Sequence, residues 1–192
     1  DNIVDSCLEK ILDNLKGQAY YVTVRPHPQH VRHKAEFMEQ LKKQYEQNPD
    51  IEIQTDFSSN DTVFEADLVI TDWSSIAYDY AYTTGRPVLF INTPMKVMNP
   101  EYQKIDTVPI NILVRDEIGC SLDMDELDRV SECVETLLEN SEQYCEKIER
   151  FVDEYVYNHG TSAEVGAKYI VSRIQKKIEE KKKGSKIKGD GI

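Results

Sequence analysis

The chain has 192 residues, which is enough for one domain with a full hydrophobic core and short for two. Its 35 acidic and 23 basic side chains give a formal net charge of -12, which repels nucleic acid, so we expect no nucleic-acid partner. No apolar run approaches the roughly 20 residues needed to cross a bilayer. No signal peptide opens the chain either, so we expect a cytoplasmic protein.

The first quarter of the chain predicts a helix, a strand and a second helix. Apolar residues between Ile3 and Leu15 recur at helical spacing. Residues 20–24 form a β-rich run that must end at Arg25-Pro26-His27-Pro28, because proline cannot continue a strand. Residues 31–47 then have helical periodicity, and 51–54 alternate like a strand.

The central part has the most regular pattern. Residues 61–65 predict a short helix, and 67–71 are a nearly continuous apolar strand of the kind buried in a parallel sheet. Asp72-Trp73-Ser74-Ser75 follows, then a helix to about Thr84 and a buried strand at 88–91. Strands that alternate with helices on short loops predict an α/β fold, a Rossmann-like parallel sheet with flanking helices.

The last part is harder to read. Residues 92–122 are expected to be mostly loop, with 110–114 as a candidate strand, and 123–156 predict one or two helices. A capping box of Thr161 and Glu164 opens a final helix that runs to about Lys182. We expect one domain over 1–175 and a disordered, Lys-rich tail over 176–192, which is either solvated or in weak contact with a membrane surface.

Two polar clusters follow strands, and ligands of open parallel sheets bind beyond the carboxyl ends of strands. Ser74 and Ser75 stand where a helix begins, so their amides and hydroxyls could bind a phosphate beside Asp72. Asp79 lies one turn further and could accept hydrogen bonds from a ribose. The alternative is that Asp72 or Ser74 only caps the helix and that Asp79 is a solvated charge.

The second cluster is the proline-stiffened loop that holds Arg25 and His27. Arginine can grip phosphate oxygens and histidine can donate a hydrogen bond or a proton, although a rigid surface turn is the simpler reading. His30 and His33 are expected to be ordinary surface residues. Zinc binding by the three histidines is disfavoured, because no matching cysteine or carboxylate set is apparent.

Other motifs favour structural readings. Thr161 begins the last helix, where a second anion could bind, but helix capping explains it as well. Asp123 and Asp125 form a D-x-D pattern that we interpret as helix capping and not as a metal site. Four scattered cysteines predict reduced core residues: Cys7, Cys120, Cys133 and Cys145.

Three segments together resemble a known family. They are Arg25-Pro26-His27-Pro28, residues 65–81 (EADLVITDWSSIAYDYA) and Arg86-Pro87-Val88-Leu89-Phe90. In this order they resemble the C-terminal donor domain of the CDP-glycerol glycerophosphotransferases of teichoic acid and capsule synthesis. The resemblance is strong over residues 20–95 and weak over 159–174.

The resemblance implies the C-terminal half of a GT-B fold that binds a nucleotide-diphosphate donor without a cofactor or metal. It implies that Ser74 and Ser75 contact the donor pyrophosphate and that His27 lies by the transferred phosphate. An acceptor hydroxyl would attack the glycerol-bearing phosphorus of CDP-glycerol and release CMP. The polyol phosphate or glycan acceptor would bind an N-terminal half outside this sequence, which we expect to be a fragment of a longer chain.

One departure from the family pattern bears on the substrate. Residues 92–102 lack the R-G-F-Y type stretch that we associate with the polymerases, so the polyol and the polymerase activity are undecided. Two alternative functions also stay open. A GT-B sugar transferase or epimerase relative could use a UDP-sugar at the same phosphate site. A non-catalytic binding domain could keep the fold without the chemistry.

Overall fold

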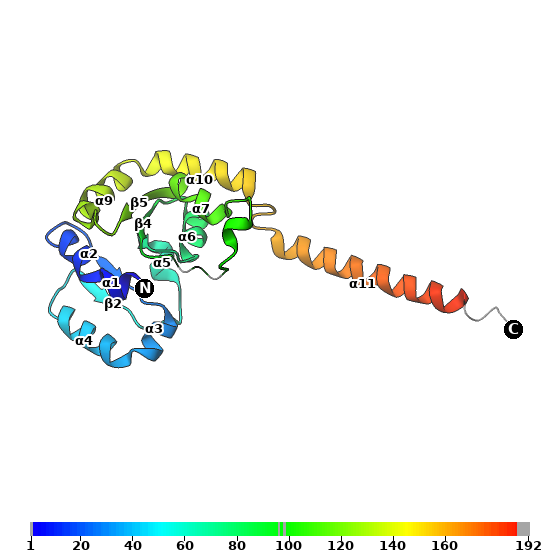
Figure 1. The fold of residues 1–192 in the computed structure, drawn as a ribbon, viewed down its shortest axis with the longest axis horizontal. Coiled ribbons are helices and arrows are strands. Elements are labelled where there is room, and N and C mark those ends of the chain that lie inside the picture. Colours follow the sequence, from blue (N-terminus) through cyan, green and yellow to red (C-terminus); the bar gives the residue numbers. More distant parts are fainter. Residues whose placement is uncertain (1, 96, 98, 188–192) are drawn as a thin grey trace. The chain divides into compact units, whose positions relative to one another are not determined.

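The computed structural model describes residues 2–95, 97 and 99–187. It divides into two compact units, Asp1–Glu149 and Arg150–Ile192. The first unit contains the strands and most of the helices, and Figure 1 labels many of the elements of both units. The first unit ends before the boundary predicted at residue 175.

The strands of the first unit are short and parallel. Their described members are β1 (Val22–Val24), β2 (Ile51–Ile53), β3 (Val69–Thr71), β4 (Val88–Asn92) and β5 (Gly119–Asp123). They form a sheet of β1 and β2 and a second sheet in the order β3-β4-β5, in place of one continuous sheet. Within the second sheet Val69 pairs with Val88, and Val88 pairs with Gly119. Parallel strands with flanking helices confirm the predicted Rossmann-like α/β class.

Helices cover these sheets. In the first unit they are α1 (Ile3–Ser6), α2 (Leu8–Leu15), α3 (Pro28–His33), α4 (Ala35–Tyr45), α5 (Asp61–Glu65), α6 (Ile76–Thr84), α7 (Ile110–Leu113), α8 (Arg115–Ile118) and α9 (Val130–Glu139). Two 3₁₀ turns add Tyr102–Lys104 and Leu127–Arg129, and α10 (Ser141–Tyr155) runs across the boundary between the units. α4 packs on β2, and α9 packs on β4 and β5.

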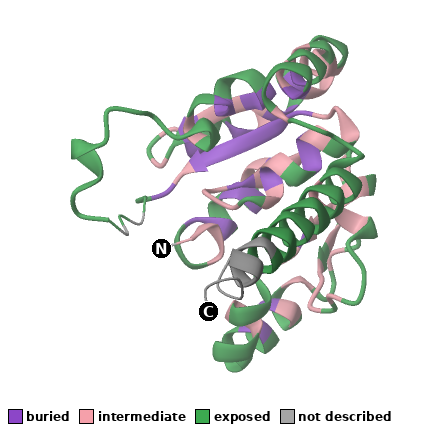
Figure 2. Ribbon diagram, turned by 90° about the vertical axis from the view of Figure 1, so that its right-hand side faces the viewer, coloured by how far each residue is buried: buried purple, intermediate pink, exposed green. Residues whose placement is uncertain are grey.

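The core follows the apolar pattern of the sequence. Buried residues, purple in Figure 2, are concentrated on β4 and on the helices of the first unit. Val88, Leu89, Phe90 and Ile91 are fully buried, as expected for a strand covered on both faces. α2 contributes its apolar stripe to the same core, although the helix predicted from Ile3 to Leu15 is interrupted at Cys7.

Arg86 and Tyr80 show what the Arg-Pro segment does in the fold. The Arg86 guanidinium donates to the carbonyls of Glu65 at 2.9 Å and Ala66 at 2.7 Å, at the C-terminal end of α5. The buried Tyr80 hydroxyl donates to the same Ala66 carbonyl at 2.9 Å, and burial raises the pKa of Tyr80 to about 12. Carbonyls at a helix end need such donors, so these side chains fix the chain just before β3.

Residues 92–122 differ most from the prediction. Residues 110–113 are helix α7 and not a strand, and the fifth strand is β5 at Gly119–Asp123. The apolar residues of 110–114 alternate as in a strand, but Pro109 stands at the N-cap, and the Val114 amide closes the helical turn onto the Ile110 carbonyl. Asp123 is the last residue of strand β5, so our interpretation of Asp123 as a helix cap is wrong.

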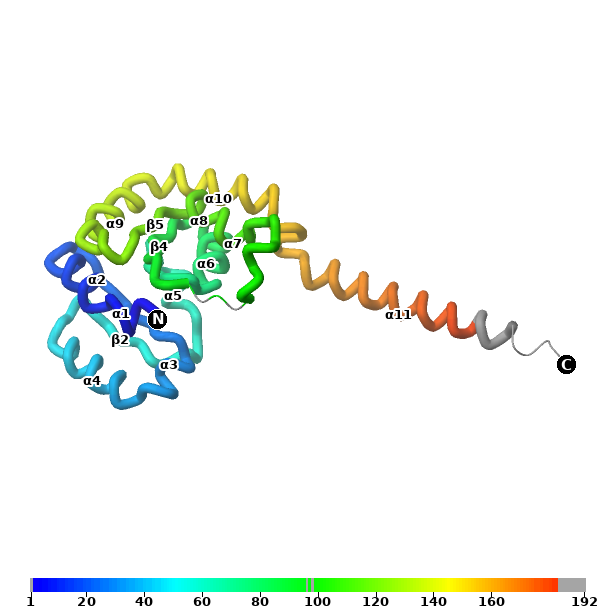
Figure 3. Tube along the Cα trace, viewed as in Figure 1, coloured from blue at the N-terminus to red at the C-terminus, as the bar shows by residue number. Residues whose placement is uncertain are grey.

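The second unit contains the end of α10, a turn and α11 (Ser162–Ile187), most of which Figure 3 traces in orange to red. The Thr161 hydroxyl donates to the Asn158 carbonyl at 3.3 Å, and the Glu164 carboxylate pairs with Lys168 at 2.5 Å. These contacts differ from the predicted capping box. α11 continues past the expected end near Lys182, so part of the Lys-rich tail is helical, and 188–192 lie outside the described residues. None of the described helices is long and apolar enough to cross a membrane.

Candidate functional site

The polar residues that follow β1 and β3 line one cavity. Arg25 and His27 come from the end of β1, and Asp72 and Ser74 come from the end of β3. The cavity measures about 2010 Å³, which exceeds the ~300 to 1,000 Å³ of a typical small-molecule site. Residues from 94 to 112 also contribute to its lining. Four of the residues that the sequence suggested therefore line the same cavity.

His27 is held by the helix that it begins. Its Nδ1 accepts a hydrogen bond from the Gln29 amide at 3.2 Å, so it caps α3, and Pro28 occupies the first helical position. An accepting Nδ1 leaves the proton of a neutral imidazole on Nε2. The exposed His27 side chain can therefore present an N–H donor to an anion in the cavity.

Arg25 already uses one guanidinium nitrogen to bind the segment before α5. Its Nη2 donates to the Ser59 carbonyl at 2.5 Å and to Asn60 Oδ1 at 3.0 Å, and its guanidinium lies 5.5 Å from the Phe57 ring centroid. Its Nη1 is buried and has no hydrogen-bond partner among the described residues. One nitrogen of Arg25 is therefore an unpaired buried donor, which is costly in a folded protein.

The N-terminus of α6 supplies the other donors. The helix begins at Ile76, and the hydroxyl of the N-cap residue, Ser75, makes no capping bond. Among the described residues, the amides of Ser74, Ser75 and Ile76 find no acceptor. Unpaired amides at a helix N-terminus, together with the positive end of its dipole, favour an anion.

The structure separates the two serines. Ser74 is partly buried and lines the cavity, whereas Ser75 is exposed and lies outside the lining. Asp79 is also exposed and outside the lining. Thr161 belongs to the second unit, so its predicted role at this site stays a prediction.

A buried arginine behind the Asp72–Ser75 loop was not expected. Arg115 begins α8 and is only 4% exposed. Its guanidinium carbon lies 4.1 Å from the Trp73 ring centroid and 4.2 Å from that of Phe90. Its Nη2 donates to Asn92 Oδ1 at 2.7 Å. No sequence signal distinguishes this arginine from one on the surface, since it stands in a segment that we expected to be loop or strand.

Charges around Arg115 are sparse. Burial lowers the pKa of Arg115, and the nearby Tyr78, Asp116 and Asp72 partly oppose that change. Among the described residues no carboxylate pairs with its guanidinium within ion-pair distance. Arg115 therefore remains a cation whose hydrogen-bond partners are neutral.

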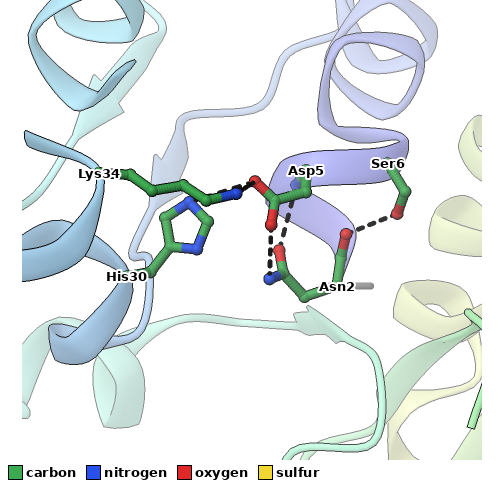
Figure 4. Close-up of polar contacts among 5 residues, drawn as sticks. All are labelled: Asn2, Asp5, Ser6, His30 and Lys34. Carbon is green, nitrogen blue, oxygen red and sulfur yellow. Dashed lines mark hydrogen bonds and ion pairs between the residues drawn. The ribbon is translucent and has the colours of Figure 1, made fainter. Parts of the chain in front are cut away.

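His30 was misjudged from the sequence. Its side chain is 9% exposed, so it is not an ordinary surface residue, while His33 is exposed as expected. Figure 4 shows His30 and Lys34 approaching Asp5 from α3 and its C-terminal end, with His30 Nε2 at 3.4 Å and Lys34 Nζ at 2.6 Å from Asp5 Oδ1. Burial raises the pKa of Asp5, but the Lys34 hydrogen bond and the nearby positive charges outweigh it and leave the pKa below its ordinary value.

The remaining polar motifs give no separate site. Asn92 Nδ2 donates to Asp123 Oδ1 at 2.7 Å, so Asp123 joins the ends of β4 and β5. In the described part of the chain no group of three His, Cys, Asp or Glu residues could hold a metal ion. The four cysteines are free.

The fold and the site thus define an α/β protein of the Rossmann-like class with donors for an anion at the ends of its parallel strands. Comparison with known proteins is consistent with this class. Residues 4–175 match the CDP-Glycerol:Poly(glycerophosphate) glycerophosphotransferase family, and the chain belongs to that family of transferases. Neither a curated protein nor a solved structure matches the chain.

Proposed function

We propose that this chain binds CDP-glycerol, or a related CDP-polyol, and presents it for transfer of polyol phosphate to an acceptor hydroxyl in teichoic acid or capsular polymer synthesis. The observation that carries the proposal is the convergence of His27, Ser74 and the α6 N-terminus on one cavity in a member of this family. These groups offer hydrogen-bond donors to a diphosphate without a metal.

The proposed reaction is a displacement at phosphorus. The acceptor oxygen forms a bond to the polyol-bearing phosphorus, the bond from that phosphorus to the bridging oxygen breaks, and CMP leaves with the bonding electrons. Charge develops on the phosphoryl oxygens, so donors fixed in advance stabilise the transition state. We place Arg25, His27 and the Asp72–Ser74 loop around that phosphorus and the diphosphate.

Nucleotide binding tests the donor class. Thermal unfolding of the purified chain is followed with CDP-glycerol, CMP, CDP, UDP and UDP-glucose. We expect stabilisation by the cytidine compounds that exceeds that by the uridine compounds, because a ligand that binds only the folded state raises its stability. A stronger response to UDP-glucose would indicate a sugar donor, and no response to any nucleotide would refute the proposal.

The two serines give a matched pair of variants. Ser74→Ala is expected to weaken CDP binding by about tenfold or more, because a hydrogen bond to a charged oxygen contributes roughly 1.5 to 3 kcal/mol. Ser75→Ala is expected to change the affinity less than about threefold, since Ser75 lies outside the cavity lining. Calorimetry measures both affinities, and circular dichroism checks the fold. Equal effects of the two substitutions would contradict the placement of the diphosphate beside Ser74.

We further propose that the acceptor binds a separate domain, as in a GT-B enzyme. Correct orientation of two reactants contributes roughly 7 to 11 kcal/mol to lowering a barrier. A chain that holds the donor alone would therefore bind a cytidine nucleotide and release CMP slowly, with water as the acceptor.

We propose that α11 supports peripheral contact with an anionic membrane. Ile170, Ile174 and Ile178 recur every four residues along α11 and are about half exposed, at 58%, 54% and 48%. Lys177 and Lys181 each follow one of these isoleucines by three residues, so basic groups border the apolar stripe. Such a helix can lie in an anionic bilayer surface.

Substitution on opposite faces of α11 tests this contact. Ile174→Glu is expected to lower binding to phosphatidylglycerol vesicles by roughly tenfold, because it removes apolar burial and adds a negative charge. Ser172→Glu adds the same charge on the opposite face, two residues away, and is expected to have a smaller effect. Vesicle sedimentation measures both. The same loss in the two variants would show that charge alone matters and would argue against insertion of the stripe.

A further inference from the structure

Arg115 joins the carboxyl ends of three neighbouring strands. Its Nη1 lies 3.4 Å from the carbonyl of Asp72, which follows β3, and its Nη2 donates to Asn92, the last residue of β4. Asn92 in turn donates to Asp123, the last residue of β5. The guanidinium thus lies at the centre of a network under the edge of the sheet where ligands of this fold class bind.

Arg115 also holds Trp73 in place. The guanidinium is stacked between the rings of Trp73 and Phe90, and the Trp73 indole nitrogen donates to the Thr93 carbonyl at 2.7 Å. Trp73 and Asp72 both line the cavity, whereas Arg115 does not. Any influence of Arg115 on a ligand therefore passes through the Asp72–Ser75 loop and through its charge.

The buried charge of Arg115 is not balanced by an ion pair within the described residues. A buried guanidinium is costly unless a carboxylate or several hydrogen bonds compensate it, and Arg115 has an amide oxygen, a distant carbonyl and two aromatic faces. A buried cation whose direct partners are neutral attracts an anion, and the nearby Asp72 and Asp116 offset only part of that attraction. The Asp72–Ser75 loop, which Arg115 contacts at Asp72 and Trp73, leads into the unpaired amides at the α6 N-terminus.

We propose that Arg115 is a positioning residue for the donor diphosphate, which fixes the Asp72–Ser75 loop and supplies positive potential behind it. This inference rests on the proposed function, because it takes the diphosphate as the ligand of that loop. Arg115 therefore strengthens binding of the phosphates of the ligand and not of its base or ribose.

The test compares ligands of increasing negative charge. In Arg115→Met, affinity for CDP and for inorganic pyrophosphate is expected to fall about tenfold or more, and affinity for cytidine less than about twofold. Arg115→Lys keeps the charge but cannot reach both oxygens or stack as a plane, so its loss should be intermediate. Arg173→Met, on the exposed face of α11, changes the net charge equally and should leave all three affinities unchanged.

Trp73 provides a second readout, because it is the only tryptophan in the chain. In both Arg115 variants acrylamide should quench its fluorescence more strongly than in the wild type, since the ring loses the guanidinium stacked on it. A role in stability alone would lower the affinities for CDP and cytidine by the same factor. Equal losses, or unchanged CDP affinity in a folded Arg115→Met, would overturn the proposal.

Two further results, a variant that does not fold and a wild type that does not bind a ligand, also test the role of Arg115. If Arg115→Met does not fold, Arg115→Lys takes its place, and unchanged CDP affinity and quenching in that variant would overturn the inference. If the wild type binds pyrophosphate but no cytidine nucleotide, the proposed donor fails, and the comparison with pyrophosphate still tests Arg115. If it binds neither, no anion is held by the loop, and the inference fails with the proposed function.

Discussion

Replacing Gly119 with alanine is expected to prevent stable folding of the first unit. Gly119 opens β5 and pairs with Val88 of β4, and an added Cβ would lie 1.7 Å from the Val88 carbonyl oxygen and 2.7 Å from its carbon. The obstacle is backbone on a fully buried strand, so no side chain can turn away to relieve it. The sheet would have to separate between β4 and β5, which places the cost above the usual 1 to 3 kcal/mol of overpacking, at roughly 4 kcal/mol or more.

Urea denaturation followed by Trp73 fluorescence measures this loss, because the loop of Trp73 follows β3, the neighbour of β4. Gly166→Ala is the matched control: it makes the same change on α11, where no atom lies within 4 Å of the added carbon. Alanine should leave α11 intact or stabilise it slightly, since glycine disfavours a helix by about 0.5 to 1 kcal/mol. A Gly119→Ala protein with the wild-type midpoint would mean that the two strands are further apart than described.

The predicted fold succeeded where local pattern and tertiary burial agree. β3, α6 and β4 lie within a residue or two of the predicted ranges, because two apolar runs flank a helix that Gly85 ends at a φ of 68°. A left-handed C-terminal residue is a position that glycine occupies without strain, so the sequence itself marks the boundary. The strands form two separate sheets, β1-β2 and β3-β4-β5. The residue pattern of a single strand does not show which sheet that strand joins.

β5 was missed because its sequence is not distinctive. Gly119-Cys120-Ser121-Leu122-Asp123 has few β-branched or aromatic residues, and its pairing with β4 depends on the space that Gly119 leaves. Ile110-Asn111-Ile112, which alternates like a strand, forms a helix instead. Ile110 and Leu113 are about half exposed, so the helix there depends on Pro109 at its N-cap and on the turn that the Val114 amide closes onto Ile110, and not on burial.

For the candidate site, the sequence indicated two loops that line the same cavity but not the directions of their side chains. Arg25, His27, Asp72 and Ser74 line one cavity, although the strands that they follow, β1 and β3, belong to separate sheets. The helical offset that suggested Asp79 does not bring it to the cavity, and the exposed Ser75 lies outside the lining. Arg115 was missed because its burial depends on Trp73 and Phe90, which are 42 and 25 residues away in the sequence.

Replacing His27 is expected to lower turnover of CDP-glycerol about 100-fold or more, because a positioned donor or proton-transfer group contributes typically ~10² to 10⁴ to a rate. CMP affinity should change less than about threefold, since His27 is proposed to meet charge that develops in the transition state. The rate is measured as CMP release in the presence of a glycerol phosphate acceptor, in a protein that contains this chain and the proposed acceptor domain. His33→Ala removes an exposed histidine that lines the same cavity, and its rate should stay close to that of the wild type.

The choice of substitution separates catalysis from helix capping. His27→Ala removes the hydrogen bond from the Gln29 amide to Nδ1 as well as the imidazole, so it should also lower stability by about 0.5 to 2 kcal/mol. His27→Asn can still cap α3, because asparagine is a favoured N-cap, but it has no nitrogen at the position of Nε2. If His27 acts on the transferred phosphate, both variants lose turnover and only the alanine variant loses stability. Wild-type turnover in a stable His27→Asn protein would assign His27 to the cap alone and would move the chemistry to another residue of the cavity.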